Sequence, residues 1–467
     1  MFNRFCLRAM LIIFALILLA AIGAGLALGM ASFVVLAAAL VLAAGMWFLL
    51  PPISGLLGRL GALRCFLLLS ALCLAVKGGY ILLVRVPLSG DAETFYNYAC
   101  ALAGLRPEAG WRYMALFPHV YGYSAFLGAF IRIFGEAPLL AQWLNVILSL
   151  LAGGCIYLLC LRELGLRQAI SAYLLWILCP SQTMFNSLVL SEPLYTVLLL
   201  GFLLLCSAAS GSRTGICKWL AAGILGGLLL RLLNVCRPIA AIPVIALLLW
   251  LLFLEPKRLG ESSGLRWLSF LAAALLVSAV TGPLIDSHLE DILGEPPART
   301  VGYNMYVGLN EDSGGAWNEE DSALLDELNG EAGSTAVQIQ EQFQELSKQR
   351  AAQIGDWSGL LLRKLGILMG TDSGCVEYSL EALTYPRVLS VTCTCFYWAC
   401  ILVAVINCAL LLRRAESSIL MLLPIYAIGL VLAQMLVEVA GRYHYSLIPA
   451  ILVMAAYKGG KKETSAA

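Results

Sequence analysis

The stretch Gly90-Asp91-Ala92-Glu93-Thr94-Phe95-Tyr96-Asn97-Tyr98 follows an apolar segment, about Cys65 to Val86, that is long enough to cross a bilayer. It places two carboxylates directly at the end of that segment. A carboxylate beside an apolar wall loses water and becomes a better base. Asp91 is therefore the first candidate for chemistry, and the alternative is that it only marks the solvated end of a helix.

The composition of the whole chain is that of a polytopic membrane protein. Of 467 residues, 61% are hydrophobic and 13% charged, whereas soluble proteins average about 45–50% and about 25%. The net charge of +1 and the lack of a large basic face or tail argue against nucleic-acid binding. Most of the 15 cysteines lie in apolar runs, and the C-x-C pair Cys393 and Cys395 lacks the further ligands of a zinc site. We predict no disulfide framework and no required cofactor.

Basic residues in the loops predict the topology. Arginines precede the first apolar run and follow the second, so the start of the first run and the end of the second are predicted to lie in the cytoplasm. The third span then leads outward, and Asp91 emerges on the extracytoplasmic face. We interpret the first run as a retained span because it exceeds the length of a cleavable signal sequence. The prediction is an all-α, multi-pass cell-membrane protein with both termini cytoplasmic and about twelve transmembrane helices. These are expected at about 10–29, 31–50, 65–86, 139–161, 169–185, 193–210, 219–234, 239–254, 267–284, 388–412, 417–437 and 443–456.

Four parts are expected along the chain. Residues 1–64 form two extra N-terminal transmembrane helices, and 65–284 form a transmembrane core whose first extracytoplasmic loop, 88–137, contains an interfacial helix at 121–134. Residues 285–387 form an extracytoplasmic acidic loop with amphipathic helices. Residues 388–467 form the C-terminal transmembrane helices and a basic cytoplasmic tail.

The acidic loop carries its own helix signals. Its first part, 285–357, holds fifteen of the 29 acidic residues of the chain. Asn318 can cap a helix that starts at Glu319, where acids complement the positive end of the helix dipole. A second helix is expected at about 334–354, and an amphipathic one at 358–369.

In this topology the unusual polar residues gather on the outer side, as a site for a charged lipid headgroup requires. They are Asp91, Glu93, Arg106, Arg112, His119, Glu192, Arg237, Lys364, Glu438, Arg442 and His444. Structural interpretations stay open for some of them. Arg237 can anchor to bulk lipid phosphates, Glu192 can be a helix-start acid before Pro193, and Glu438 with Arg442 can form a structural salt bridge.

The order of short motifs from about Val86 to Tyr457 resembles the polyprenyl-phosphate-sugar-dependent glycosyltransferases of the GT-C superfamily. Within it, the chain looks most like the family 39-like branch that includes protein O-mannosyltransferases and the aminoarabinose transferases acting on lipid A. The matching motifs are Asp91-x-Glu93 with Tyr96 and Tyr98, Phe117-Pro118 to Phe134-Gly135, Trp143-Leu144-Asn145, Ser191-Glu192-Pro193-Leu194, Arg237-Pro238, Gly308-Leu309-Asn310 to Gly315-Ala316-Trp317-Asn318, Lys364, and Arg442-Tyr443-His444 before Pro449. Each is weak alone, and the order is what makes the likeness specific.

The resemblance implies a cell-envelope enzyme that moves a sugar from a polyprenyl phosphate to an acceptor hydroxyl, with inversion, on the extracytoplasmic side. It gives Asp91 the role of general base, with Glu93 able to exchange roles with it. The cations available for the lipid phosphate are Arg237, Lys364 and Arg442.

Further side chains are expected to bind the sugar or the acceptor. They are Glu192, Tyr96, His119, Tyr443 and His444. The acceptor is a glycan, a protein or a lipid, and membrane lipids are the other expected partners. A divalent metal at Asp91-x-Glu93 is the less favoured alternative, because arginine and lysine can neutralise a departing lipid phosphate alone.

Two other classes of function compete with this one. A transporter or lipid flippase would suit about twelve spans, but transport predicts charged or broken segments near mid-bilayer. Here Lys77 and Arg231 are the main deep charges. A non-catalytic assembly or polymer-ligation partner that uses the outer loop would not need Asp91.

Overall fold

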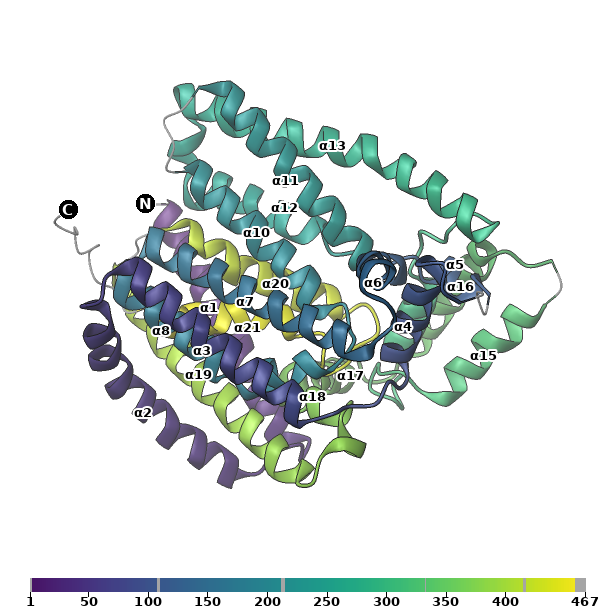
Figure 1. Ribbon diagram of the computed structural model, residues 1–467, viewed down its shortest axis with the longest axis horizontal. Coiled ribbons are helices and arrows are strands. Elements are labelled where there is room, and N and C mark those ends of the chain that lie inside the picture. Colours follow the sequence, from purple (N-terminus) through teal and green to yellow (C-terminus); the bar gives the residue numbers. More distant parts are fainter. Residues whose placement is uncertain (1, 107–109, 211–214, 332, 415–416, 458–467) are drawn as a thin grey trace.

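The computed structural model describes residues 2–106, 110–210, 215–331, 333–414 and 417–457. Within these ranges every regular element is a helix, so the predicted all-α fold is confirmed. Figure 1 shows a bundle of long, roughly aligned helices. Gathered at the end remote from the first turn of α1 (Phe2–Ala27) are α4 (Asp91–Leu102), α5 (Arg112–Leu116), α15 (Glu319–Gly330) and α16 (Ala336–Gln353).

Eight helices of the described residues are long and apolar enough to cross a membrane. They are α1 (Phe2–Ala27), α2 (Phe33–Gly58), α3 (Ala62–Leu83), α7 (Pro138–Glu163), α10 (Glu192–Ser210), α11 (Ile216–Cys236), α13 (Glu261–Leu293) and α19 (Pro386–Arg414). The chain therefore has the character of a multi-pass membrane protein.

The expected count of twelve spans is not confirmed, because four of the predicted spans are short helices. These are α8 (Leu166–Leu178), α12 (Ala241–Leu249) with a π-helix (Trp250–Leu254), α20 (Leu422–Gln434) and α21 (Ile448–Ala456). A 13-residue helix rises about 20 Å, against a hydrocarbon core of about 30 Å. Hydropathy did not reveal these breaks, because the flanking residues are apolar too.

One of the breaks falls at a proline. The single span expected at 169–185 ends at Leu178, and the chain continues as α9 (Pro180–Met184) and a 3₁₀ turn (Phe185–Ser187). Proline has no backbone N–H and clashes with the preceding turn, which ends a helix before it. The buried turn leads the chain to Glu192, at the start of α10.

The first helix is an inner member of the bundle. In its most apolar 18-residue window α1 is 44% buried, against 22% for α2. It packs against α19, α20 and a π-helix (Gly366–Gly370). A Cβ on Gly25 would lie 2.4 Å from the carbonyl oxygen of Gly370, so α1 and the π-helix approach as closely as only glycine allows.

Helices α11 and α13 form a long pair beside the rest of the bundle (Figure 1). A Cβ on Gly223 or Gly227 would lie 2.4 Å or 2.6 Å from a carbonyl oxygen of α13, so small residues again set the packing distance. Helix α13 runs to Leu293, past its expected end at Leu284, and stops at Gly294, whose φ of +74° suits glycine.

The remaining helices flank the bundle at the end where the acidic segment lies. They are α4 (Asp91–Leu102), α5 (Arg112–Leu116), α6 (Val120–Phe134), α14 (Gly302–Gly308), α15 (Glu319–Gly330), α16 (Ala336–Gln353), α17 (Trp357–Leu365) and α18 (Gly374–Glu377). The predicted cap is confirmed, because the Asn318 side chain accepts a hydrogen bond from the Asp321 amide. The amphipathic helix expected at 358–369 is α17 followed by the π-helix.

A buried ion pair joins α15 to α16. The Arg350 guanidinium donates to Asp321 at 2.8 and 3.0 Å, and Asn318 and Asn310 also donate to this carboxylate. Burial alone would raise the pKa of Asp321, but these hydrogen bonds outweigh it and hold the pKa below its usual value. The ionised pair therefore stabilises the fold above about pH 4, and this contribution is lost as the pH falls further.

We expect Arg350→Met to lower the free energy of unfolding by about 1–3 kcal/mol at pH 7, because it leaves a buried carboxylate short of donors. The loss should shrink as the pH falls below about 4, first as the carboxyl group of the unfolded chain and then as that of the folded protein becomes protonated. Thermal unfolding of the detergent-solubilised protein at several pH values measures both effects. Lys348→Met, which removes only an exposed pair with Glu345, is the control. Equal melting temperatures for the two variants at pH 7 would contradict this account of the pair.

Candidate active site

Four charged residues that are far apart in the sequence meet in one cluster. Asp91 is the first residue of α4, after Gly90, whose φ of +54° favours glycine. Glu192 is the first residue of α10, and Arg237 follows the last residue of α11. Arg442 lies in the turn between α20 and α21. Three of these residues stand at helix ends and Arg442 stands in a turn.

The ionic contacts run in a chain from the first residue to the last. Asp91 pairs with the Arg442 guanidinium. The Oε1 atom of Glu192 lies 3.6 Å from Nε of Arg442 and 3.9 Å from Nη1 of Arg237. Glu192 is 1% exposed and Arg442 is 8% exposed, while 39% of the Asp91 side chain is open to solvent. The sequence predicted that Asp91, Arg237 and Arg442 gather in one place, and Glu192 links the two arginines here.

Aromatic rings separate the two guanidinium groups. Cζ of Arg237 lies 3.9 Å from the centre of the Tyr443 ring, and Cζ of Arg442 lies 5.4 Å from it. Tyr378 lies against Arg442 at 5.0 Å, and Tyr195 against Arg237 at 5.8 Å. Cation–π contact offsets part of the repulsion between the arginines and fixes the planes of their donor groups.

Glu438 extends the cluster toward α14. It accepts hydrogen bonds from the Tyr443 hydroxyl at 3.3 Å and from the Asn304 amide at 3.2 Å. Burial raises the pKa of Glu438 above its usual value, helped by Asp91 and opposed by Arg442. The cluster therefore holds a third carboxyl group beside those of Asp91 and Glu192.

His119, half-buried just before α6, faces the same charges. Burial lowers its pKa to about 4, Arg237 and Arg442 add to this effect, and Asp91 opposes it. The imidazole is therefore neutral at physiological pH. The structure thus brings His119 and Tyr443 to the cluster, as the sequence predicted.

Two other predicted residues lie away from the cluster. The amine of Lys364 is fully buried and donates to the backbone carbonyls of Gly308 at 2.6 Å and Val437 at 2.7 Å. Burial lowers its pKa to about 8, and Glu438 opposes this effect. His444 faces the opposite side of the turn, between the Leu368 carbonyl at 2.7 Å and Asp372 at 3.0 Å. Both side chains connect backbone segments around the cluster.

Two predicted residues of α4 also point elsewhere. Tyr96 is buried beside Cys100, and Glu93 is exposed on the helix surface. Asp91 is thus the α4 carboxylate that the fold places against an arginine. The same first turn presents its two acids to different surroundings because they stand two residues, about 200°, apart on the helix.

Sequence reasoning missed three members of this region. Tyr378, Asn304 and Asp372 lie in irregular or short helical segments, where no motif marks them. The sequence places Glu438 among the outer charged residues but predicts no catalytic or binding role for it. The signal for Tyr378 and Asn304 is spatial only, because each contacts a charged residue far away in the sequence.

We expect Glu93→Gln to leave the activity of this site within about twofold of that of the unmodified protein. The physical reason is its exposure, since a solvated carboxylate outside the cluster neither contacts the arginines nor loses water. Activity of the purified variant, measured beside an Asp91 variant, tests this. A large loss on Glu93→Gln with little loss on the Asp91 variant would show that the two acids have exchanged roles.

Among the described residues, no group of three or more histidine, cysteine, aspartate or glutamate side chains is arranged to hold a metal ion. Cys393 contacts Cys375 and Met184, with sulfur–sulfur distances of 4.0 and 3.9 Å, and Cys375 also lies 3.9 Å from Met184.

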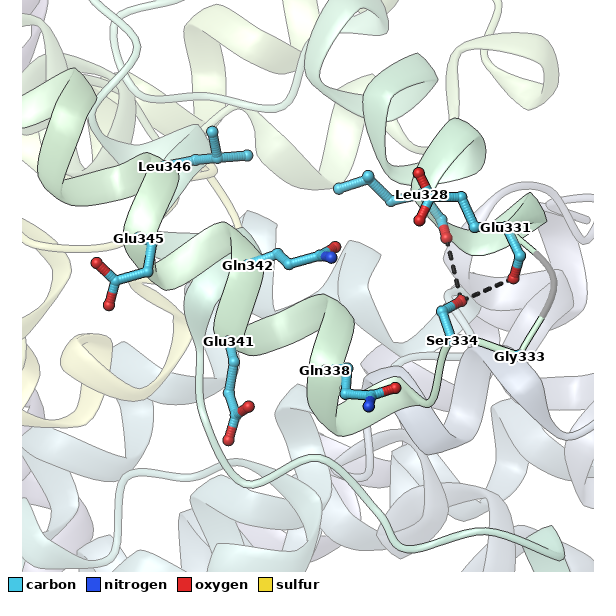
Figure 2. A pocket seen from close by; sticks show the side chains of 9 residues that line it. All are labelled: Leu328, Glu331, Gly333, Ser334, Gln338, Glu341, Gln342, Glu345 and Leu346. Carbon is cyan, nitrogen blue, oxygen red and sulfur yellow. Dashed lines mark hydrogen bonds between the residues drawn. The ribbon is translucent and has the colours of Figure 1, made fainter.

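Two cavities lie on this end of the molecule. The smaller, of about 330 Å³, adjoins the cluster and is lined by residues 86, 87, 89, 90 and 377–381. The larger, of about 780 Å³, lies between the end of α15 and α16, and none of its lining residues belongs to the cluster. Figure 2 shows Glu341 and Glu345 on α16 at this hollow, and the Ser334 hydroxyl bonded to the carbonyls of Leu328 and Glu331.

The fold and the cluster define an all-helical, multi-pass membrane protein with a charged site at one end of the bundle. No known protein family's sequence profile matches the chain, and no curated protein sequence does. Solved structures do resemble it. One is the archaeal oligosaccharyltransferase AglB from Archaeoglobus fulgidus in complex with an inhibitory peptide and a dolichol-phosphate, at 15% identity and a TM-score of 0.47. That alignment covers 85% of this chain and 49% of AglB, so this chain spans about half the length of that relative.

A second is ArnT from Cupriavidus metallidurans bound to undecaprenyl phosphate, at 12% identity and a TM-score of 0.34, with 84% of this chain and 77% of that chain covered. ArnT and AglB are polyprenyl-phosphate-dependent glycosyltransferases of the GT-C superfamily, the class that the sequence motifs resemble. Both TM-scores lie below 0.5, so the function proposed next rests on this chain's own residues.

Proposed function

We propose that this protein transfers a sugar from a polyprenyl-phosphate-linked donor to an acceptor hydroxyl, with inversion, on the extracytoplasmic side of the membrane. Asp91 is the general base in this proposal. The donor phosphate binds at Arg442 and Arg237, and the termini are cytoplasmic.

The observation that carries the proposal is a set of buried, unsatisfied polar atoms in the cluster. Nη1 of Arg442 and Oε2 of Glu192 have no hydrogen-bond partner among the described residues, and Nε of Arg442 and Oε1 of Glu192 face only each other, at 3.6 Å. Buried polar groups are nearly always bonded, so such a set marks a place for a ligand. Planar guanidinium donors beside a second arginine suit the oxygens of a phosphate.

The same contacts support an order of events. In the structure, Asp91 is held by Arg442. A lipid phosphate that binds Arg442 competes with Asp91 for the guanidinium and releases the carboxylate. The base then becomes free only when the donor is in place.

In the transfer step, Asp91 takes the proton of the acceptor hydroxyl as its oxygen attacks the anomeric carbon. The bond from that carbon to the phosphate oxygen breaks, and Arg442 and Arg237 stabilise the negative charge that develops on the phosphate. Glu192 holds both arginines in position. His119 is neutral and can hydrogen-bond a sugar hydroxyl without adding charge.

Transport is the second candidate, and the deep charges bear on it. Lys77 is fully buried, with its amine 3.5 Å from the Thr183 hydroxyl and 5.3 Å from the centre of the Trp176 ring. Arg231 donates to the Ser278 carbonyl across the α11–α13 pair. Each deep cation thus has local partners, and these contacts favour a structural role over a transport path.

The test uses the purified protein in lipid nanodiscs with a polyprenyl-phosphate hexose and an alkyl glucoside. We expect release of polyprenyl phosphate and formation of a disaccharide with inverted anomeric configuration. A product of retained configuration would overturn the one-step mechanism. Movement of the donor lipid across a vesicle bilayer without any glycosidic product would favour the transporter.

A further inference from the structure

The cavity of about 330 Å³ opens beside the candidate base. One wall is formed by residues 86, 87, 89 and 90, and the last of these, Gly90, immediately precedes Asp91. The opposite wall is the segment 377–381, which carries Tyr378. Because Tyr378 also lies 5.0 Å from Cζ of Arg442, the cavity is one residue away from each member of the Asp91–Arg442 pair.

The lining of this cavity is acidic. Glu377 and Glu381 are exposed carboxylates on its wall, and the lining, all of it in described residues, contains no lysine or arginine. Ser373 donates to Glu377 at 2.9 Å and so restrains that carboxylate. The remaining polar side chains on the wall are the hydroxyls of Ser89, Ser379 and Tyr378.

The two sides of the cluster therefore differ in charge. Arg442 and Arg237 face Glu192 and provide the unsatisfied donors for a phosphate. The cavity on the Tyr378 side offers carboxylates and hydroxyls, which attract hydroxyl and amine donors and repel anions. A single displacement needs its two substrates on opposite sides of the reacting carbon. The charges of the site match this need, since the arginine side suits the donor phosphate and the Tyr378 side suits an acceptor hydroxyl.

We infer that this cavity receives the acceptor, and that the acceptor is a neutral or amine-bearing polyol and not an anionic polymer. The inference rests on the proposed function. The volume is at the lower end of small-molecule pockets, about 300–1,000 Å³. It therefore accommodates the terminal sugar or hydroxylated end of an acceptor, whose reacting hydroxyl reaches Asp91 past Gly90.

The test compares three acceptor probes with one polyprenyl-phosphate hexose donor: an alkyl glucoside, its 6-amino-6-deoxy form and its 6-phosphate. We expect the unmodified protein to use the phosphate probe at least about tenfold less well, in kcat/KM, than the other two. Glu377→Gln with Glu381→Gln should reduce this discrimination about fivefold, since two like charges then no longer repel the phosphate. The matched control is Glu341→Gln with Glu345→Gln in the larger hollow, which should leave the ratio unchanged.

An unchanged ratio in the Glu377/Glu381 double variant, or a preference of the unmodified protein for the phosphate probe, would overturn the inference and leave the proposed function standing. Absence of product and of polyprenyl phosphate release with all three probes would instead overturn the proposed function, and the inference with it.

A second variant tests the cavity by blocking it after the protein has folded. Leu380 is 55% exposed on the cavity wall, so Leu380→Cys can be labelled with a bulky methanethiosulfonate. Cys217 is an exposed cysteine and is replaced by serine in the same protein to prevent its labelling. We expect labelling to remove more than nine-tenths of acceptor transfer while binding of polyprenyl phosphate persists. Leu346→Cys, in the larger hollow, is the labelled control and should keep its activity. Full transfer after complete labelling at residue 380 would overturn the inference.

Discussion

Asp91→Asn should lower kcat for sugar transfer by about 10²–10⁴, the range that a general base contributes. The asparagine keeps the size of the side chain and removes the site that accepts the proton. Polyprenyl phosphate release by the purified variant, at saturating donor and acceptor, measures the effect. Glu93→Gln, two residues along the same helix, is the matched control.

The variant also breaks the ion pair with Arg442. This loss leaves donor binding intact, whereas misfolding would abolish donor binding together with transfer. Arg442 keeps Glu192 at 3.6 Å and gains freedom to meet a phosphate. We therefore expect Asp91→Asn to keep a melting temperature near that of the unmodified protein and to bind donor normally. A folded Asp91→Asn protein with full transfer would remove Asp91 from the mechanism.

Arg442→Gln should raise the barrier to transfer by about 2–4 kcal/mol, because it removes the donors that stabilise the departing phosphate. This corresponds to a loss of about 30-fold to 1,000-fold in kcat/KM. The variant also leaves Asp91 and Glu192 without their common partner, so its folding must be verified by thermal unfolding beside the activity measurement.

Arg299→Gln is the matched control for the loss of an arginine. Its side chain is 73% exposed and pairs with Asp286 at the end of α13, outside the cluster. It should behave as the unmodified protein does. If Arg442→Gln folded normally and transferred sugar at the rate of Arg299→Gln, Arg442 would not be a phosphate ligand.

Much of the fold was predictable, because bilayer insertion imposes strong patterns. Apolar length predicted the long helices, and the Asn318 cap followed from a simple residue pattern. The break before Pro180 and the short helices near α20 and α21 were not predicted. Their ends depend on packing against neighbouring helices inside an apolar environment, which hydropathy cannot distinguish from lipid.

The candidate site was predictable in its charges and less so in its geometry. Asp91, Glu192 and Arg237 stand at helix ends and Arg442 stands just before the last predicted span, so the pattern of spans already pointed them to one place. Tyr443 and His444 looked equivalent in the sequence, yet the tight turn sends one ring between the arginines and the other to Asp372. Side-chain direction in such a turn depends on tertiary contacts, which no local motif records.

The central claim is that the buried arginines exchange Asp91 for a lipid phosphate. The most direct measurement is the affinity of polyprenyl phosphate, by native mass spectrometry in nanodiscs, for the unmodified protein, Asp91→Asn and Arg442→Gln. We predict that Asp91→Asn binds at least as tightly as the unmodified protein and that Arg442→Gln binds at least about tenfold more weakly. Equal affinities for all three proteins would contradict the claim.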